Sequence, residues 1–245
     1  MPSKKVKEII KTLKGESTSK RVENLKRFFK TGVGEYAYGQ KFLGVPTPFV
    51  QKIAKDSVKN NEVILADSVE LLKSDIYDIK LCGLNIMKFM YKGALKCKDQ
   101  KEVEKIYKAL MKNLSLVNNW GLVDSSAPYI SGPYLFENKK ERKILNTLVS
   151  SKCQWKRRVA MVSTWYFIKQ GEVKPTFVLA KKLIKDKEDL IHKASGWMLR
   201  EAGKKDKKAL TDFLDKNCRV MPRTMLRYSI ERLTEKERAK YLSNK

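Results

Sequence analysis

The fold of this chain is decided around one stretch, Asn118-Asn119-Trp120-Gly121-Leu122-Val123-Asp124-Ser125-Ser126-Ala127-Pro128. Asparagine at 118 or 119 is a good N-cap, because its side chain can accept a hydrogen bond from an otherwise unpaired N–H of the first helical turn. A helix that begins here presents Trp120 and Asp124, four residues apart, on one face. Since a buried carboxylate is costly and an exposed tryptophan unusual, this pair fits the wall of a cleft. The alternative is that Asp124 pairs with a neighbouring helix while Trp120 packs in the core.

The stretch from residue 124 to 128 has counterparts elsewhere in the chain. They are Lys80-Leu81-Cys82-Gly83-Leu84, Arg158-Val159-Ala160-Met161-Val162, Lys193-Ala194-Ser195-Gly196-Trp197 and, more weakly, Thr224-Met225-Leu226-Arg227-Tyr228. Their first residues are 44, 34, 35 and 31 positions apart, a spacing typical of two-helix HEAT or armadillo repeats that stack into a solenoid. No alternating strand pattern or hairpin turn signal accompanies them. We therefore predict an all-α, HEAT-like solenoid, with N-terminal helices over residues 1–60 and repeats from about 62 to 240, forming a single domain over 1–245.

Equivalent positions of a solenoid line one surface, so the first residues of these motifs should share the inner, concave wall. That column contains Lys80, Asp124, Arg158 and Lys193. The bases would neutralise phosphates, whereas an acid in the same row requires a separate reason. Either Asp124 pairs with a neighbouring arginine, or it takes part in chemistry at a basic, concave face.

The overall charge indicates a polyanionic partner. Lys and Arg number 53 against 27 Asp and Glu, a formal net charge of +26. Nucleic acid is the partner that this excess favours; an anionic membrane surface and a merely lysine-rich composition are the alternatives. The sequence has no run of 18 apolar residues, so we expect no membrane span.

The cysteines and histidine argue against a metal site. The chain has four cysteines, none in a C-x-x-C pair, and one histidine, so we expect no metal and no cofactor. Free thiols suit a reducing compartment, so we expect a cytoplasmic, nucleoid-associated protein in a prokaryote or a nuclear one in a eukaryote.

The N-terminal region reads as two helices and a loop. Apolar residues recur at helical spacing over residues 4–30, with a break at 15–19. A glycine-rich loop over residues 31–42 holds Tyr36 but lacks the order of a phosphate-binding loop. Thr47 is the expected N-cap of the next helix, with Pro48 at its first position.

Four segments, taken together, resemble the AlkD-like DNA alkylation repair glycosylases over about residues 20–240. They are the Gly-Glu-Tyr loop running into Phe42-Leu43-Gly44-Val45-Pro46-Thr47-Pro48, the stretch from Asn118 to Pro128, Trp155 through Ala160, and Lys193-Ala194-Ser195-Gly196-Trp197-Met198-Leu199-Arg200-Glu201. The resemblance implies a monomeric HEAT-like solenoid that cradles duplex DNA without a cofactor. It also implies excision of N3- and N7-alkylated purines, such as 3-methyladenine and 7-methylguanine, without inserting the base into a pocket.

The resemblance also implies residue roles. The catalytic aspartate of the family falls on Asp124, its two sugar-facing aromatics on Trp120 and Trp197, and its phosphate-binding arginine on Arg158. Further DNA contacts are expected at Lys80, Lys193, Tyr36 and Arg157. At Gly121, many relatives carry an acidic residue instead.

The chemistry of such an excision explains why so few groups would be needed. An N3- or N7-alkylated purine is cationic and leaves as a neutral base, so no general acid has to protonate it. The sugar becomes positively charged at C1′, and a carboxylate aimed there would stabilise the transition state. Two aromatic rings would attract the same charge, each by about 0.5–2 kcal/mol.

Two other functions remain open from the sequence. The same fold could bind damaged or branched DNA without excision, or serve as a scaffold for protein or RNA. Among the other candidates, we predict that His192 is a surface or DNA-facing residue and that Trp165 lies in the core, whereas Trp155 could take either place.

Overall fold

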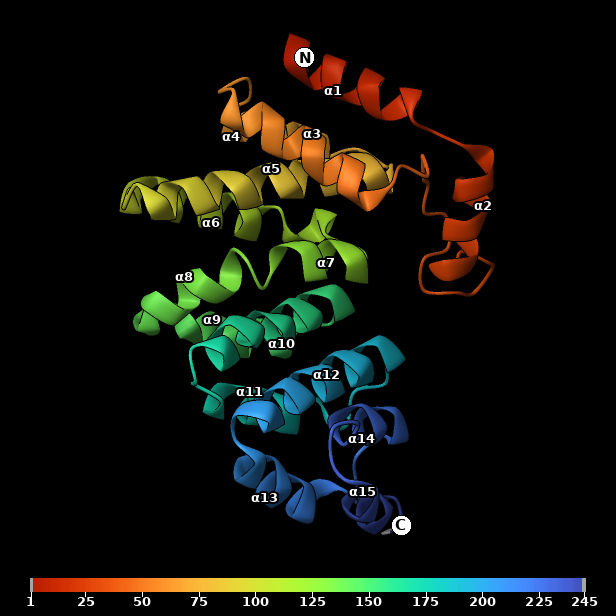
Figure 1. The fold of residues 1–245 in the computed structure, drawn as a ribbon, viewed down its shortest axis with the longest axis vertical. Coiled ribbons are helices and arrows are strands. Elements are labelled where there is room, and N and C mark those ends of the chain that lie inside the picture. The colour runs from red at the N-terminus through yellow and green to blue at the C-terminus, as the bar shows by residue number, and fades with distance from the viewer. Residues whose placement is uncertain (1, 244–245) are drawn as a thin grey trace. The chain divides into compact units, whose positions relative to one another are not determined.

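The computed structural model describes residues 2–243, and its regular elements over that range are helices (Figure 1). They are α1 (Lys4–Gly15), α2 (Ser19–Phe28), α3 (Thr47–Lys59), α4 (Leu65–Leu72), α5 (Tyr77–Lys96), α6 (Gln100–Lys112), η1 (Leu114–Leu116), α7 (Trp120–Ser126), α8 (Ser131–Glu137), η2 (Lys139–Lys143), α9 (Ile144–Val149), α10 (Gln154–Lys169), α11 (Lys174–Leu183), α12 (Asp189–Lys205), α13 (Lys207–Asn217), α14 (Arg223–Ser229) and α15 (Glu235–Ser243). An isolated bridge joins Lys41 to Ile76. The prediction of an all-α repeat fold is confirmed.

The chain forms two compact units, Met1–Ser126 and Ala127–Lys245. The border between the two units falls at the end of α7, within the stretch from Asn118 to Pro128. A single domain over 1–245 and a concave basic face both concern the two units together, and they stay predictions.

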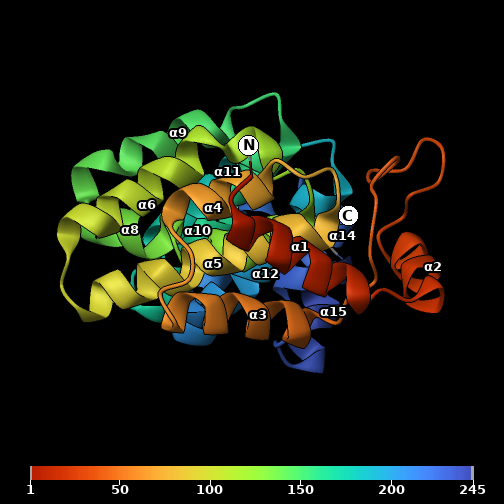
Figure 2. The same cartoon turned by 90° about the horizontal axis from the view of Figure 1, so that it is seen from above.

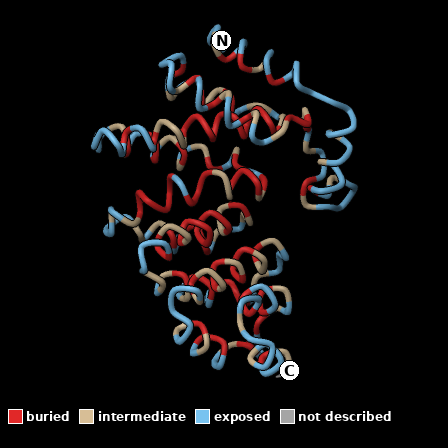
Figure 3. The backbone as a smooth tube through the Cα atoms, in the orientation of Figure 1, coloured by how far each residue is buried: buried red, intermediate tan, exposed pale blue. Residues whose placement is uncertain are grey.

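In the first unit, α5 is the central helix. It packs against α3, α4, α6 and α7; Figure 2 shows α3 alongside it, and most of the N-terminal half of α5 is buried in Figure 3. A methyl group at Gly83 would lie only 2.6 Å from the carbonyl oxygen of Ser68 in α4. The small residue that the sequence motif places here is therefore what lets α4 and α5 pack backbone to backbone.

The second unit is built around α10 and α12. The α10 helix packs against α8, α9, α11 and α12, and α12 packs in turn against α11, α13 and α14. A methyl group at Gly196 would lie 2.6 Å from the carbonyl oxygen of Met225 in α14. Gly83 and Gly196, each the fourth residue of its motif, thus both allow a neighbouring helix to approach closely, which is α4 for Gly83 and α14 for Gly196.

The α2 helix is joined to the first unit mainly through the loop that follows it. It contains no buried residue and is drawn as exposed over most of its length (Figure 3). Asp78 at the start of α5 accepts hydrogen bonds from the backbone N–H groups of Leu43 (2.7 Å) and Val45 (2.9 Å). Between them Gly44 has φ +76°, and a side chain there would meet the backbone nitrogen of Val22 at 2.8 Å. These contacts fix the end of the loop.

One boundary differs from the prediction. The N-cap of α3 is Pro46, and Thr47 is already its first helical residue. Pro48 accordingly occupies the second position, where its missing N–H is still tolerated because the first helical turn leaves its N–H groups unpaired.

Candidate functional site

The α7 helix begins at the residue after Asn119. The side-chain oxygen of Asn119 accepts a hydrogen bond from the N–H of Gly121 at 3.0 Å, and its carbonyl accepts from Leu122 and Val123. Of the two candidate caps, Asn119 is therefore the one used, and Trp120 and Asp124 both lie on the helix that it starts.

Trp120 is half-buried against aromatic rings from the end of α2 and the loop that follows it. Its ring stacks on Phe29 with centroids 4.9 Å apart and an interplanar angle of 29°, and it meets the edge of Phe28 at 5.6 Å. Its indole N–H donates to the hydroxyl of Tyr36 at 2.9 Å. Stacking and hydrogen bond together fix the tilt of the indole. The ring is neither fully buried nor fully exposed, and its place at the wall of a cleft stays a prediction.

The packing around Gly121 leaves no room for a side chain. A side chain at this position would collide with the hydroxyl oxygen of Tyr77 from α5. The Tyr77 ring cannot easily yield, because its centroid lies 4.9 Å from that of Phe29 and 5.3 Å from that of Phe42. Glycine therefore allows α7 to approach α5 with the aromatic cluster in place.

Asp124 lies half-buried one turn after Trp120. Burial raises the pKa of Tyr77 above its usual range, and the negative charges of Asp78 and Asp124 add to this rise. The Asp124 carboxylate is thus near enough to Tyr77 to disfavour ionisation of the Tyr77 hydroxyl. We name the group formed by Trp120, Asp124, Tyr36, Phe29 and Tyr77 the α7 cluster.

Lys80 was predicted to contact DNA, but its side chain forms hydrogen bonds within the protein. Its ammonium donates to the carbonyl of Leu116 at 3.0 Å and to the side chain of Asn118 at 2.9 Å. The side chain is buried, and burial lowers its pKa. Phosphate binding by Lys80 does not fit these contacts, because its donors are directed at the turn that leads into α7.

In the second unit, Arg158 is a buried residue of α10. Only 5% of it is exposed, and its guanidinium donates to the carbonyl of Leu190 at 2.6 Å. This bond ties α10 to the start of α12, where Lys193 and Trp197 lie. An arginine has five donors, so this bond leaves the predicted phosphate contact as a prediction.

Arg157 is occupied by the protein itself. Its Nε and Nη2 atoms donate hydrogen bonds to the carboxylate of Asp186, at 2.6 and 3.0 Å. Its Nη1 atom donates to the carbonyls of Ser151 and Lys152. Four hydrogen bonds from a side chain with five donors leave little capacity for a phosphate. The predicted DNA contact at Arg157 does not fit this geometry.

Lys193 and Trp197 share one face of α12, four residues apart, and both are half-buried. Lys193 pairs with Asp189 at 2.8 Å. Burial raises the pKa of Asp189, but hydrogen bonds from Lys193 and Thr224 outweigh burial and leave the pKa below its usual value. The structure thus gathers Trp120, Asp124 and Tyr36 in the first unit, and Arg158, Lys193 and Trp197 in the second. The union of these two sets in one site stays a prediction.

The structure also shows the surroundings of Trp165, Trp155 and His192, the other candidates from the sequence. Trp165 is half-buried, so the prediction that it lies in the core is wrong, and the ammonium of Lys169 lies 4.5 Å from the centroid of its ring. Trp155 is buried, and the Nε2 atom of His192 lies 2.7 Å from the carbonyl oxygen of Asp186.

Sequence reasoning missed the aromatic partners of Trp120. Phe28 and Phe29 were counted only as apolar positions of a helix, and Tyr77 was not considered. The doublet Phe28-Phe29 directly before a glycine-rich loop is the signal that could have pointed to them, since two adjacent rings cannot both face the same core.

The described part of the chain contains neither a metal-binding group of side chains nor a helix suited to crossing a membrane. Over residues 2–243 no group of three or more His, Cys, Asp or Glu side chains is arranged to hold a metal ion. Within the same range, none of the helices combines the length and the apolar character needed to cross a membrane.

Comparison with known proteins gives a family and a shared fold. The family model described as DNA alkylation repair enzyme matches residues 9–233. None of the curated proteins matches the chain in sequence.

Among solved structures, a predicted DNA alkylation repair enzyme from Enterococcus faecalis is 16% identical with a TM-score of 0.70, covering 90% of this chain and 98% of its own. AlkD2 from Streptococcus mutans is 16% identical with a TM-score of 0.56, covering 88% and 98%. The protein smu.31 from Streptococcus mutans UA159 is also 16% identical, with a TM-score of 0.51 and coverage of 91% and 95%. At this identity the likenesses show the fold alone.

Proposed function

Because the chain belongs to the family of DNA alkylation repair enzymes, we propose that it is a monofunctional DNA glycosylase. Its substrates would be cationic N3- and N7-alkylated purines in duplex DNA, with 3-methyladenine and 7-methylguanine as the simplest cases. We expect it to act as a monomer and without a cofactor.

The observation that carries this proposal is the α7 cluster. A carboxylate and an indole stand one helical turn apart, and the indole is fixed by Phe29 and by the hydroxyl of Tyr36. A group held in place before the reaction costs no reorganisation while charge develops, which is why preorganised electrostatics contributes so much to catalysis. The net charge of +26 supports a polyanionic substrate.

The proposed reaction is a hydrolysis. The bond between C1′ and the purine nitrogen breaks, its electron pair goes to the purine, and the cationic base leaves neutral. Positive charge then appears on C1′ and O4′, where the carboxylate of Asp124 and the face of Trp120 would stabilise it. A water molecule adds its oxygen to C1′ and loses a proton, with Asp124 placed to orient it. The products are a free base and an abasic site.

In this proposal Trp197 is the other sugar-facing ring, and Arg158 is a ligand for a flanking phosphate. A guanidinium presents a planar pair of donors that suits a phosphate. Lys193 would add a second positive charge on the same helix as Trp197.

The test is base release under single-turnover conditions from a duplex with one 7-methylguanine, and from one with 3-methyladenine. Release of free base with matching abasic sites is expected. Tight binding without release would support a non-catalytic damage-binding protein instead. Neither binding nor release would support a scaffold for protein or RNA.

A further inference from the structure

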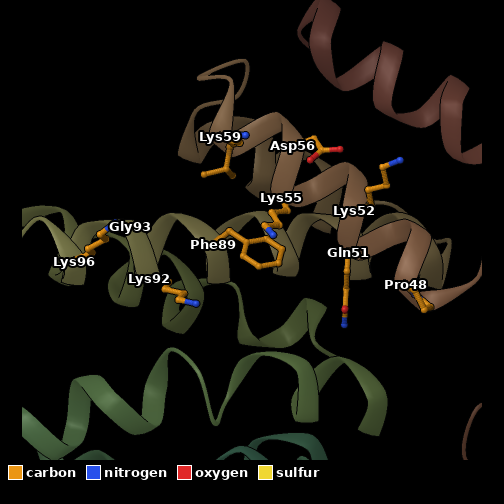
Figure 4. A pocket seen from close by; sticks show the side chains of 11 residues that line it. Pro48, Gln51, Lys52, Lys55, Asp56, Lys59, Phe89, Lys92, Gly93 and Lys96 are labelled. Atoms are coloured by element: carbon orange, nitrogen blue, oxygen red, sulfur yellow. The ribbon is translucent and has the colours of Figure 1, made fainter.

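A groove between α3 and α5, away from the α7 cluster, collects positive charge. It has a volume of about 910 Å³ and belongs wholly to the first unit. Its basic residues are Lys52, Lys55 and Lys59 of α3 and Lys92 and Lys96 of α5. We name these five residues the lysine groove. Figure 4 shows Phe89 in the middle, between Lys55 and Lys92.

The charge of the lysine groove is not balanced by the protein. One acid, Asp56, lies among its lining residues. Between residues 2 and 243, no carboxylate lies within 4.0 Å of any of the five ammonium groups. Five bases to one acid is well above the ratio of 53 to 27 for the whole chain. The excess is therefore local and is not explained by composition alone.

A second groove in the same unit provides the contrast. It lies between α4 and α6, has a volume of about 690 Å³, and also contains lysines, among them Lys73, Lys105 and Lys112. Here Lys73 pairs with Glu70 and Lys105 with Glu102. Its charge is largely neutralised, which leaves the α4–α6 groove without a strong reason to bind an anion.

The lysine groove has a feature typical of a surface that follows a nucleic acid backbone, because spaced ammonium groups neutralise successive phosphates. In the lysine groove the ammonium groups come from one face of each helix, because residues 52, 55 and 59 and residues 92 and 96 recur at helical spacing.

The position of the lysine groove along α5 indicates how far a nucleic acid backbone bound there would lie from the α7 cluster. Tyr77, at the first residue of α5, belongs to the α7 cluster, and the lysine groove spans residues 89–96 of the same helix. At 1.5 Å per residue the separation is roughly 18–29 Å. For a duplex whose axis runs along α5, at 3.4 Å per base pair, this corresponds to about five to eight base pairs.

We infer that the lysine groove binds the sugar–phosphate backbone of duplex DNA five to eight base pairs to one side of the base placed at the α7 cluster. This rests on the proposed function only in taking the α7 cluster as the place of the damaged base. The groove contributes affinity and register on the duplex, while the chemistry stays with Asp124.

The test compares two double variants that remove the same charge. The double variant Lys55→Gln with Lys92→Gln removes two positive charges from the centre of the lysine groove. The double variant Lys73→Gln with Lys112→Gln removes two from the α4–α6 groove and is the matched control. All four lysines are exposed, so both variants should melt like the parent. Binding is measured by fluorescence anisotropy at several salt concentrations. One duplex has ten or more base pairs on each side of a 7-methylguanine, and the other has four.

Loss of two phosphate contacts should weaken binding to the long duplex about 60-fold at 0.1 M salt and reduce the slope of log affinity against log salt by about 1.8. The control should bind like the parent. On the short duplex, which does not reach the lysine groove, all three proteins should bind equally.

Three results would overturn the inference. They are parent-like binding of the long duplex by the groove variant, an equal loss in the control, and a loss as large on the short duplex as on the long one.

Base release at saturating protein separates this inference from the proposed function. A groove variant that binds weakly but releases base at the parental rate supports both. If the parent releases no base while the groove variant still loses affinity, the glycosylase proposal fails and the lysine groove stands.

Discussion

Gly121 offers a test of how the α7 cluster is held. In Gly121→Ala the new methyl group would collide with the hydroxyl oxygen of Tyr77, whereas the ring carbon Cζ, at 3.3 Å, would be a tight contact and Phe29, at 3.5 Å, an ordinary one. The hydroxyl is thus the main obstacle. The Tyr77 ring is packed against Phe29 and Phe42, so relieving the collision means moving either that ring or α7.

The expected magnitude follows from two opposing effects. Overpacking of this kind costs about 1–3 kcal/mol, and replacing glycine by alanine within a helix returns up to about 1 kcal/mol. Gly121→Ala alone should therefore be destabilised by roughly 0–3 kcal/mol. Combination with Tyr77→Phe removes the obstacle, and the coupling between the two changes should be about 1–3 kcal/mol.

The assay is a double-mutant cycle on thermal melts. In a chain of this length 1 kcal/mol corresponds to about 2–4 °C. Base release is measured on the same four proteins. A displacement of 1 Å at a reacting group can cost about 100-fold in rate, so Gly121→Ala should excise more slowly and the double variant should recover. A cycle with no coupling, or a slow excision that Tyr77→Phe does not restore, would show that the hydroxyl of Tyr77 does not set the position of α7.

Three further substitutions test the proposed roles. Asp124→Asn should lower excision of 7-methylguanine by roughly 100-fold or more while DNA binding holds or tightens; unchanged excision, or a loss explained wholly by unfolding in a melt, would remove Asp124 from the mechanism. Arg158→Ala should lose affinity and rate together with about 1–3 kcal/mol of stability, because the carbonyl of Leu190 loses its donor. Arg158→Lys should recover only part of the affinity, and an alanine variant that folds, binds and excises like the parent would contradict the role. Tyr36→Phe, which frees the indole N–H of Trp120, should slow excision several-fold at saturating protein with little change in the melt; a parental rate would mean that stacking on Phe29 suffices to hold the ring.

The Trp120–Asp124 pair shows what could be read from the sequence. Their spacing of four residues and the asparagine before them predicted a helix that presents both on one face, and α7 begins where Asn119 caps it. The spacing of the five-residue motifs predicted stacked helix pairs, and the glycines of two motifs, Gly83 and Gly196, lie where neighbouring helices approach closely. Such inferences succeed because helical periodicity and capping are local properties, determined by residues a few positions apart.

The identity of a residue's partners is a different matter. Lys80 and Arg157 carry the right charge at the right spacing for phosphate contacts, yet both direct their donors at the protein's own carbonyl and side-chain oxygens. Spacing along the chain does not reveal this, because the acceptors come from segments 29–38 residues away or from a turn whose course depends on the packing around it.

Helix formation, the repeat spacing and the net charge could thus be predicted from local pattern and composition. Three further relations become visible in the folded chain: Phe29, Tyr36 and Tyr77 surround the start of α7, the hydroxyl of Tyr77 excludes a side chain at Gly121, and five lysines of α3 and α5 share one groove. These relations join residues distant in the chain, because the packing of side chains in three dimensions brings such residues together.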